Sequence, residues 1–142
     1  MRISTKGRYA LSMMVDLAQH QEDGYVSLRD VAERQGISKK YLEQIVLIFN
    51  RSGVLKTSRG FQGGYRLARS PEEYTVGEIL RITENGLSPV PCVDEDAEVC
   101  ERSAVCPTLP IWQGLNRVIN DYLNGITLQN LLEQYQASGK RI

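Results

Sequence analysis

The sequence predicts a mainly α fold with a small β-hairpin wing, in which a winged helix-turn-helix domain precedes a long C-terminal dimerisation helix. Three observations support this prediction. Apolar residues recur at three- and four-residue spacing through the first 52 residues, a glycine-rich turn between two short β-prone segments follows them, and an apolar stripe lies near the C-terminus. The 142 residues, 42% hydrophobic and 24% charged, are enough to bury one core.

Three short helices open the predicted fold, over residues 8–20, 27–35 and 38–52. Ser27 and Ser38 are typical N-cap residues, and Asp30 follows Ser27 at the spacing of a capping box. Two short helices joined by a tight glycine-containing turn are typical of a helix-turn-helix. The residues expected to face inward are Leu11, Met14, Val15 and Ala18 of the first helix and Leu28, Val31 and Ala32 of the second.

The third predicted helix carries two chemically different faces. Its apolar face consists of Leu42, Ile45, Val46 and Phe49, and its opposite face of Lys40, Glu43, Gln44, Leu47 and Arg51. Such a polar face usually lies in solvent. Its position after a second helix and before a predicted hairpin, within a basic part of the chain, favours contact with nucleic acid.

A β-hairpin is predicted over residues 54–67. Residues 54–56 and 65–67 suit two strands, and the glycine-rich residues 59–64 suit the turn between them. A hairpin that follows a helix-turn-helix forms a wing. The glycines do not indicate a nucleotide site, because no Gly-Lys-Ser/Thr follows them and no helix is expected to begin there.

The wing is followed by a predicted helix over residues 76–84 and a long loop over residues 85–109. Thr75 and Glu78 stand at capping-box spacing before this helix. The loop contains all three cysteines of the chain. A loop of this length inside a compact domain is usually functional or disordered.

A long helix is expected from Pro110, a favourable first-turn residue, to about Asn124. Its apolar stripe consists of Ile111, Trp112, Leu115, Val118, Ile119, Tyr122 and Leu123. This stripe needs cover, and a second copy of the same helix in a homodimer is the simplest partner. Thr127 is expected to cap a short last helix, and residues 138–142 are expected to fray.

The charge of the chain is unevenly distributed. The formal net charge is zero, with 17 basic and 17 acidic residues. Residues 1–70 hold 12 basic and 6 acidic residues, which gives +6, whereas residues 71–142 hold 5 and 11, which gives −6. A basic half can bind phosphate and an acidic half is repelled by it, so the first half is the expected nucleic-acid partner.

Cysteine and histidine usage excludes several classes of protein. Three cysteines, an odd number, do not form a secreted disulfide framework, and neither a signal peptide nor a membrane span is expected, so we expect a cytoplasmic protein without membrane contact. Cys92, Cys100 and Cys106 are separated by seven and five residues, which is not the Cys-x-x-Cys spacing of zinc or thioredoxin-like sites. By spacing alone an iron-sulfur cluster and redox-active or adventitious thiols both remain open. His20, the single histidine, is expected to be an ordinary, partly exposed polar residue.

Four segments resemble the IscR-type iron-sulfur cluster regulator family, whose relatives include NsrR and CymR. They are residues 1–10 (MRISTKGRYA), 38–44 (SKKYLEQ), 59–65 (RGFQGGY) and 126–128 (ITL), so the resemblance covers nearly the whole chain. It implies a dimeric winged-helix transcription regulator. It also implies that Cys92, Cys100 and Cys106, in the loop before the dimer helix, bind a cluster, with 2Fe-2S favoured over 4Fe-4S.

The sequence departs from this family at the fourth cluster ligand. A histidine three residues after the last cysteine is replaced here by Leu109, and Arg8 stands where the relative NsrR has an N-terminal acid from the partner subunit. The fourth ligand is therefore unassigned. The candidates are Asp94, Asp96, Glu98, the hydroxyl of Thr108, or a small exogenous ligand.

The predicted function is that of a non-enzymatic transcription regulator, expected to be a repressor, on a near-palindromic operator in double-stranded DNA. Its predicted parts are a DNA-binding domain over 1–84, a cluster-binding loop over 85–109, and a dimerisation helix with a short terminal helix over 110–136. Lys39 and Lys40 are expected to hold phosphates, Glu43 and Gln44 to read base edges, and Arg59 to enter the minor groove. Tyr41, Arg51 and Phe61 complete the predicted DNA-binding set.

Two other readings remain open. The first is a cluster-free winged-helix repressor of cysteine or sulfur metabolism that uses thiol oxidation or a partner enzyme, as the relative CymR does. The second is a small redox or electron-transfer protein, which leaves the basic half and the wing without a purpose.

Overall fold

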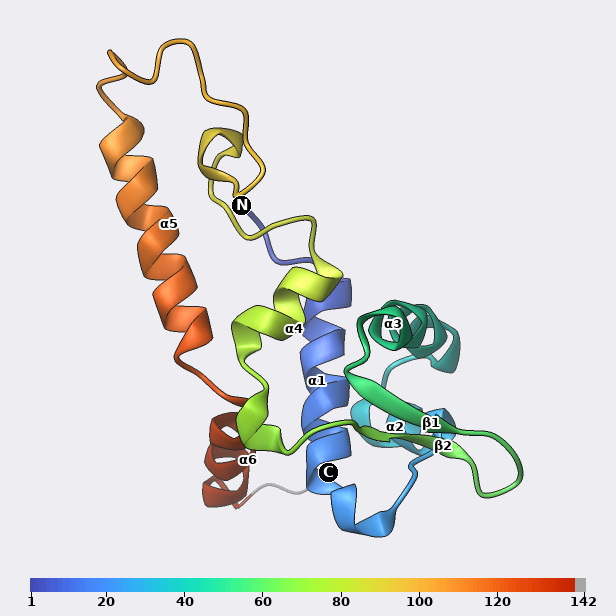
Figure 1. Cartoon of the computed structure of the whole chain (residues 1–142). Coiled ribbons are helices and arrows are strands. Elements are labelled where there is room, and N and C mark those ends of the chain that lie inside the picture. Colours follow the sequence, from blue (N-terminus) through green and yellow to red (C-terminus); the bar gives the residue numbers. More distant parts are fainter. Residues whose placement is uncertain (140–142) are drawn as a thin grey trace.

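The computed structural model describes residues 1–139, and Figure 1 shows its mainly helical fold with one antiparallel hairpin. The elements are α1 (Thr5–Gln19), α2 (Leu28–Gln35), α3 (Lys39–Ser52), β1 (Leu55–Ser58), β2 (Gly64–Leu67), α4 (Val76–Thr83), α5 (Leu109–Asn124) and α6 (Leu128–Ala137). Short 3₁₀ turns occupy Gln21–Asp23, Pro71–Glu73 and Pro91–Val93. This architecture confirms the predicted fold class. Of the residues expected to fray, 140–142 lie outside the described residues.

Serine and threonine side chains set the starts of most helices. The Ser27 and Ser38 hydroxyls accept hydrogen bonds from the amides of Asp30 and Tyr41, at 3.2 and 3.1 Å, which confirms both predicted N-caps. The prediction that the first helix begins at residue 8 is wrong. Ser4 caps it through the amide of Gly7, at 3.0 Å, and the polar first turn lacked the apolar spacing on which the prediction relied.

The predicted capping box at Thr75 and Glu78 is only half present. The Thr75 hydroxyl accepts from the Glu78 amide at 3.0 Å, but the Glu78 carboxylate pairs with Arg69 instead of returning to Thr75. A reciprocal box occurs one turn earlier, where Ser70 and Glu73 satisfy each other. Another follows at the predicted cap Thr127, whose partner is Asn130.

Most of the core surrounds α1, against which α2, α3, α4 and α6 all pack. The buried face of α3 is the predicted one, Leu42, Ile45, Val46 and Phe49. The face of α1 differs from the prediction. It buries Ala10, Met13 and Leu17 together with Met14 and Ala18, while Leu11 and Val15 are only partly buried. Leu128 and Leu132 of α6 lie in the same cluster, so the last helix returns to the first core.

A buried carboxylate joins α1 to α2. Asp16 is fully buried, and Arg34 donates to both of its oxygens, at 3.0 and 2.8 Å. Gln35 adds a third hydrogen bond at 3.0 Å. The Asp16 carboxylate raises the pKa of Arg34, so this guanidinium stays charged. These contacts fix the first helix of the helix-turn-helix on the core.

α5 stands away from the core and is reached through a long loop (Figure 1). Polar contacts hold one side of it. Arg81 of α4 donates to Asn124 at 2.8 Å and also to Asn120. Asn116 donates to the carbonyl of Val93 in the loop, at 3.3 Å. α5 begins at Leu109, one residue before the predicted start.

Candidate nucleic-acid interface and cysteine loop

The outer face of α3 presents charged and polar side chains to solvent. Lys39, Lys40, Glu43, Gln44 and Arg51 are all exposed. Four of them, Lys40, Glu43, Gln44 and Arg51, recur at three- and four-residue spacing and so share one side of the helix. The structure therefore brings most of the predicted α3 residues together on one accessible surface.

Two residues of α3 behave differently from the predicted set. Tyr41 is half-buried, and its ring meets that of Tyr9 edge-on, with centroids 5.3 Å apart and planes at 77°. It therefore packs the first turn of α3 against α1. Leu47 was left out of the predicted site, yet its side chain is exposed among the polar residues of the outer face. Its position one turn after Glu43 was the signal that could have included it.

The predicted wing is present as an antiparallel pair of strands. Leu55 pairs with Leu67 at its base and Ser58 with Gly64 near its tip. Val26, which precedes α2, adds a bridge to Tyr65 through two backbone hydrogen bonds of 2.9 and 2.8 Å. Position 64 needs glycine, because a Cβ there would overlap the carbonyl of Val26. The wing is thus fastened to the start of the helix-turn-helix.

The tip of the wing is open to solvent. Arg59 and Phe61 are both exposed, and the Phe61 ring is fully so. The Thr57 hydroxyl donates to the Asn50 side chain at 3.2 Å, which ties β1 to α3. The wing and the outer face of α3 consequently belong to one connected surface of the basic half of the chain.

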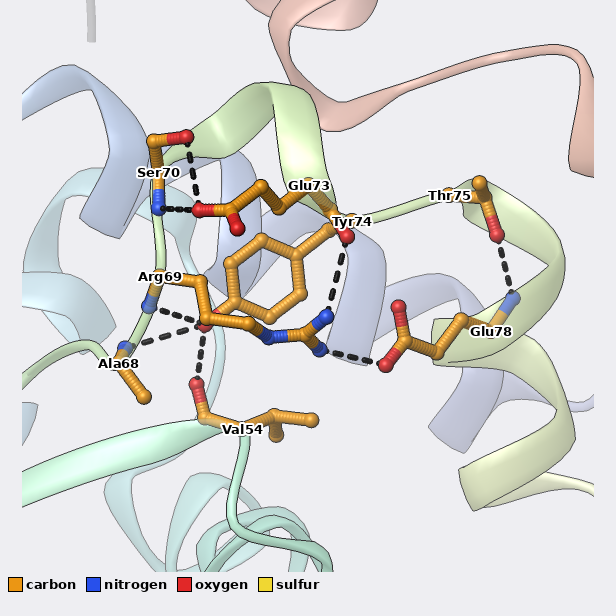
Figure 2. A network of polar contacts seen from close by, with 8 residues as sticks. All are labelled: Val54, Ala68, Arg69, Ser70, Glu73, Tyr74, Thr75 and Glu78. Atoms are coloured by element: carbon orange, nitrogen blue, oxygen red, sulfur yellow. Dashed lines mark hydrogen bonds and ion pairs between the residues drawn. The ribbon is translucent and has the colours of Figure 1, made fainter.

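A polar network lies at the base of the wing (Figure 2). Its centre is Tyr74, a fully buried side chain whose hydroxyl contacts the backbone on both sides of the hairpin. The Arg69 guanidinium lies 4.3 Å from the centre of the Tyr74 ring and pairs with Glu78, whose carboxylate raises the pKa of Arg69. Hydrogen bonds from the Ser70 amide and hydroxyl lower the pKa of Glu73. Sequence reasoning missed this network, because Tyr74 stands between elements and carries no periodicity.

The three cysteines lie in the connection between α4 and α5 as free thiols. Cys92 and Cys100 are exposed and Cys106 is half-buried. Within residues 1–139, no three Cys, His, Asp or Glu side chains are grouped as a metal site. The described conformation therefore does not bring the three predicted ligands together.

The chemistry of this loop nevertheless suits a thiolate site. Cys106 Sγ lies 3.6 Å from the Thr108 hydroxyl, and this contact, with help from nearby backbone amides and Arg102, lowers the pKa of the Cys106 thiol. Thiolates are the usual ligands of iron-sulfur clusters. His20 is engaged elsewhere, because its Nδ1 lies 2.9 Å from the Asp23 carboxylate.

The apolar stripe of α5 divides into two halves. Trp112, Ile119 and Leu123 are partly buried, whereas Ile111, Leu115, Val118 and Tyr122 have side chains 41–68% exposed. The four exposed residues recur at three- and four-residue spacing and form one continuous apolar face. No helix in the described part of the chain is long and apolar enough to cross a membrane.

Comparisons with known proteins cover nearly the whole chain. The profile of the Rrf2 family, described as iron-dependent transcriptional regulators, matches residues 3–134. An HTH-type transcriptional regulator of Neisseria meningitidis is 40% identical over 134 residues, 94% of this chain and 89% of that protein. Among solved structures, IscR of T. potens matches with a TM-score of 0.77 and 37% identity, over 100% of this chain and 93% of that one. CymR, the global cysteine regulator of B. subtilis, matches with a TM-score of 0.77 and 36% identity, over 94% and 98%.

Proposed function

The chain belongs to the Rrf2 family of transcriptional regulators, and we propose that it is a homodimeric DNA-binding repressor that reads its operator with α3 and the wing. One observation carries this proposal. The exposed polar face of α3 and the open tip of the wing are joined into a single surface by the Thr57–Asn50 contact. Most of the basic residues of the chain lie in this half, which carries a net charge of +6 by sequence. The matched family consists of transcriptional regulators rather than enzymes.

Each predicted residue has a distinct role in this proposal. Lys39 and Lys40, exposed at the start of α3, contact phosphates and set the register of the helix in the major groove. Gln44 suits adenine, which offers a donor and an acceptor in that groove. Glu43 accepts from the cytosine amino group and, being an acid beside phosphate, acts largely by rejecting wrong sequences.

The remaining residues act at the edges of the interface. Arg51, at the far end of α3, contacts the DNA backbone. Arg59 enters a narrow minor groove from the wing, where negative potential is strongest. Phe61, fully exposed beside it, packs on sugars or on a base step in the same groove. Tyr41 contributes mainly by packing α3 against Tyr9.

The exposed face of α5 supports a dimer. An apolar face of this length has no partner in the described part of one protomer, and a second α5 related by twofold symmetry would cover it. Two DNA-binding modules then require a near-palindromic operator with half-sites one or more helical turns apart, about 34 Å per turn.

The placement of α3 is tested by base preference. Operator sequences are first selected from a random library with the wild-type protein, and binding to all single-base variants is then measured. Glu43→Ala is expected to accept bases that the wild type rejects, and Gln44→Ala to lose preference at one position, by roughly 1–3 kcal/mol. Arg29→Ala, an exposed residue of α2, is the control. If Glu43→Ala leaves both affinity and preference unchanged, α3 is wrongly placed.

We further propose that Cys92, Cys100 and Cys106 bind an iron-sulfur cluster, with 2Fe-2S favoured over 4Fe-4S. The support is threefold: three thiols in one irregular loop, the lowered pKa of Cys106, and the similarity to IscR. When bound, the cluster would supply sensitivity to cluster status or to redox and nitrosative stress. The fourth ligand remains one of the loop candidates Asp94, Asp96, Glu98 and Thr108, or an exogenous molecule.

A cluster-free regulator of cysteine or sulfur metabolism is the second candidate. It is favoured by the similarity to CymR and by three free thiols that are not grouped in the described conformation. Purification without oxygen, followed by visible absorption and by iron and sulfide analysis, separates the two. The cluster proposal predicts a coloured protein whose iron is lost in Cys100→Ser, and a colourless, iron-free wild type would favour the thiol regulator.

A further inference from the structure

The hydroxyl of Tyr74 joins the two feet of the wing. It donates to the carbonyl of Val54, just before β1, at 2.6 Å. It accepts from the amides of Ala68 and Arg69, just after β2, at 3.0 Å each. Figure 2 shows the three contacts converging on one oxygen. A single buried hydroxyl therefore fixes where the hairpin enters and leaves the core.

The backbone around Tyr74 is bound to a different part of the chain. The carbonyl of Tyr74 accepts from the amide of Leu128, and the amide of Val76 donates to the carbonyl of Ile126, both at 2.9 Å. Thr75 forms an isolated bridge with Thr127 between these two bonds. Residues 74–76 are consequently paired with the connection between α5 and α6.

Arg69 extends the junction to α4. Its guanidinium covers the Tyr74 ring, donates to the carbonyl of Glu73 at 3.1 Å, and pairs with Glu78 in the first turn of α4. The ring itself is buried in the main core with the neighbouring helices. The hydroxyl is thus the part of Tyr74 that reaches the wing, whereas the ring and the backbone belong to the core and to the α5–α6 connection.

We propose that Tyr74 is a positioning residue that couples the orientation of the wing on DNA to the connection between α5 and α6. The proposal rests on the proposed DNA-binding function. Its physical basis is that rigid backbone hydrogen bonds attach Tyr74 to one moving part and its hydroxyl attaches it to the other, so neither can rotate without the other. The contacts of α3 with DNA do not depend on this hydroxyl, because α3 is held by its own apolar face.

Tyr74→Phe tests the proposal, because it keeps the ring and removes only the hydroxyl. The full-length variant is compared with wild type on the selected operator, with Tyr135→Phe in α6 as the matched control. Methylation protection of guanine N7 reports the contacts of α3 in the major groove, and hydroxyl-radical protection reports the wing in the minor groove. The effect of Arg59→Ala on affinity is measured in all three backgrounds.

The wild type and Tyr135→Phe are expected to show both protections, with a roughly tenfold loss of affinity on Arg59→Ala. Tyr74→Phe is expected to keep the major-groove protection, lose the minor-groove protection, and respond to Arg59→Ala by less than about twofold. Hydrogen exchange tests the coupling, because operator binding should slow exchange of the Leu128 amide in wild type and not in Tyr74→Phe. A Tyr74→Phe protein with intact wing protection, or with both protections lost equally, overturns the proposal. So does a Leu128 amide that ignores DNA in wild type.

A second variant covers the case in which Tyr74→Phe does not fold. Glu78→Gln weakens the hold of α4 on Arg69 and leaves the hydroxyl bonds in place, so it should reduce the minor-groove protection and leave the major-groove protection unchanged. Full minor-groove protection in Glu78→Gln counts against the proposal. If the wild type itself protects no DNA, the proposed function fails instead, and the two failures are distinguishable.

Discussion

At the residue scale, Asp16 holds α1 and α2 together through three hydrogen bonds from Arg34 and Gln35. Asp16→Asn keeps the shape of the side chain but leaves the Arg34 guanidinium without its anion in a site where Asp16 is fully buried. Removing one partner of a buried ion pair typically costs about 3 kcal/mol or more. We expect this loss in the free energy of unfolding, measured by urea denaturation.

The matched control for Asp16 lies on α2. Glu33 pairs with Arg29 at 3.3 Å, with both side chains well exposed. Glu33→Gln should cost less than about 0.5 kcal/mol, because solvent screens exposed pairs and helix pairs of this spacing contribute little. Equal losses in the two variants would show that the burial of Asp16 has no energetic consequence.

The second residue-scale prediction concerns pH. The Ser70 amide and hydroxyl lower the pKa of Glu73 in the folded protein. Since the folded pKa lies below the unfolded one, Glu73 stabilises the fold above the ordinary carboxyl value, and this contribution is lost as pH falls through the folded pKa. The stability difference between wild type and Glu73→Gln should therefore be present at neutral pH and shrink below pH of about 4.3. The neighbouring Glu72→Gln should show no comparable trend in the same pH-dependent unfolding series.

Polar residues in the core were the least predictable from the sequence. Asp16 falls among apolar residues of α1, and Tyr74 lies in a connection, so neither contributes to an apolar period. Their partners, Arg34 and Val54, are 18 and 20 residues away in sequence. Local spacing carries no information about such pairs, because the fold alone brings them together.

At the element scale, amphipathic spacing predicted α3 well and α1 less well. α3 packs on the core through one side, so its four apolar residues are the buried ones. α1 is surrounded by α2, α3, α4 and α6, and a helix enclosed on several sides buries more than one stripe. This explains why Met13 and Leu17 were missed. The wing was predictable because glycine turn chemistry is local, whereas the Val26 bridge was not.

The exposed face of α5 gives a prediction about assembly. Val118→Glu places a charge in the middle of the apolar face formed by Ile111, Leu115, Val118 and Tyr122. An unpaired charge buried between two subunits costs several kcal/mol, so the dimer dissociation constant should rise by roughly 30-fold or more. The mass in solution, followed by sedimentation across a concentration series, reports this change.

Two comparisons make the α5 prediction specific. Arg117→Glu changes the charge of α5 more strongly but at an exposed position outside the apolar face, and it should leave the dimer intact. The melting temperature of Val118→Glu at low concentration should match that of dissociated wild type, because Val118 is 64% exposed in one protomer. A dimeric Val118→Glu protein would mean that α5 is not the interface.

At the scale of the whole molecule, the cysteine site was only partly predictable. The sequence places all three cysteines in one segment, and the structure agrees that this segment joins α4 to α5 with little regular structure. Spacing along a chain does not determine which thiols meet, because an irregular loop has many conformations of similar energy. The donor set could thus be proposed from sequence, whereas the grouping of Cys92, Cys100 and Cys106 depends on what binds them.

The net charge of zero conceals two opposite halves, and this division predicts how DNA binding depends on salt. Counterion release follows the local contacts between basic side chains and phosphates, not the total charge of the protein. Affinity for the operator should therefore fall steeply as salt rises, although the chain is formally neutral. Each phosphate contact contributes about 0.9 to the slope of log affinity against log salt concentration.

Single basic residues should change this slope by countable amounts. Lys40→Ala removes one phosphate contact from each subunit of the proposed dimer, so the slope should become shallower by roughly 2, with nearly equal loss of affinity on all sequences. Arg117→Ala removes a cation from α5 in the acidic half and should leave the slope unchanged. Titrations at four or more salt concentrations measure both slopes. Equal changes in the two variants would show that DNA responds to the total charge of the molecule, and the assignment of phosphate contact to α3 would then be wrong.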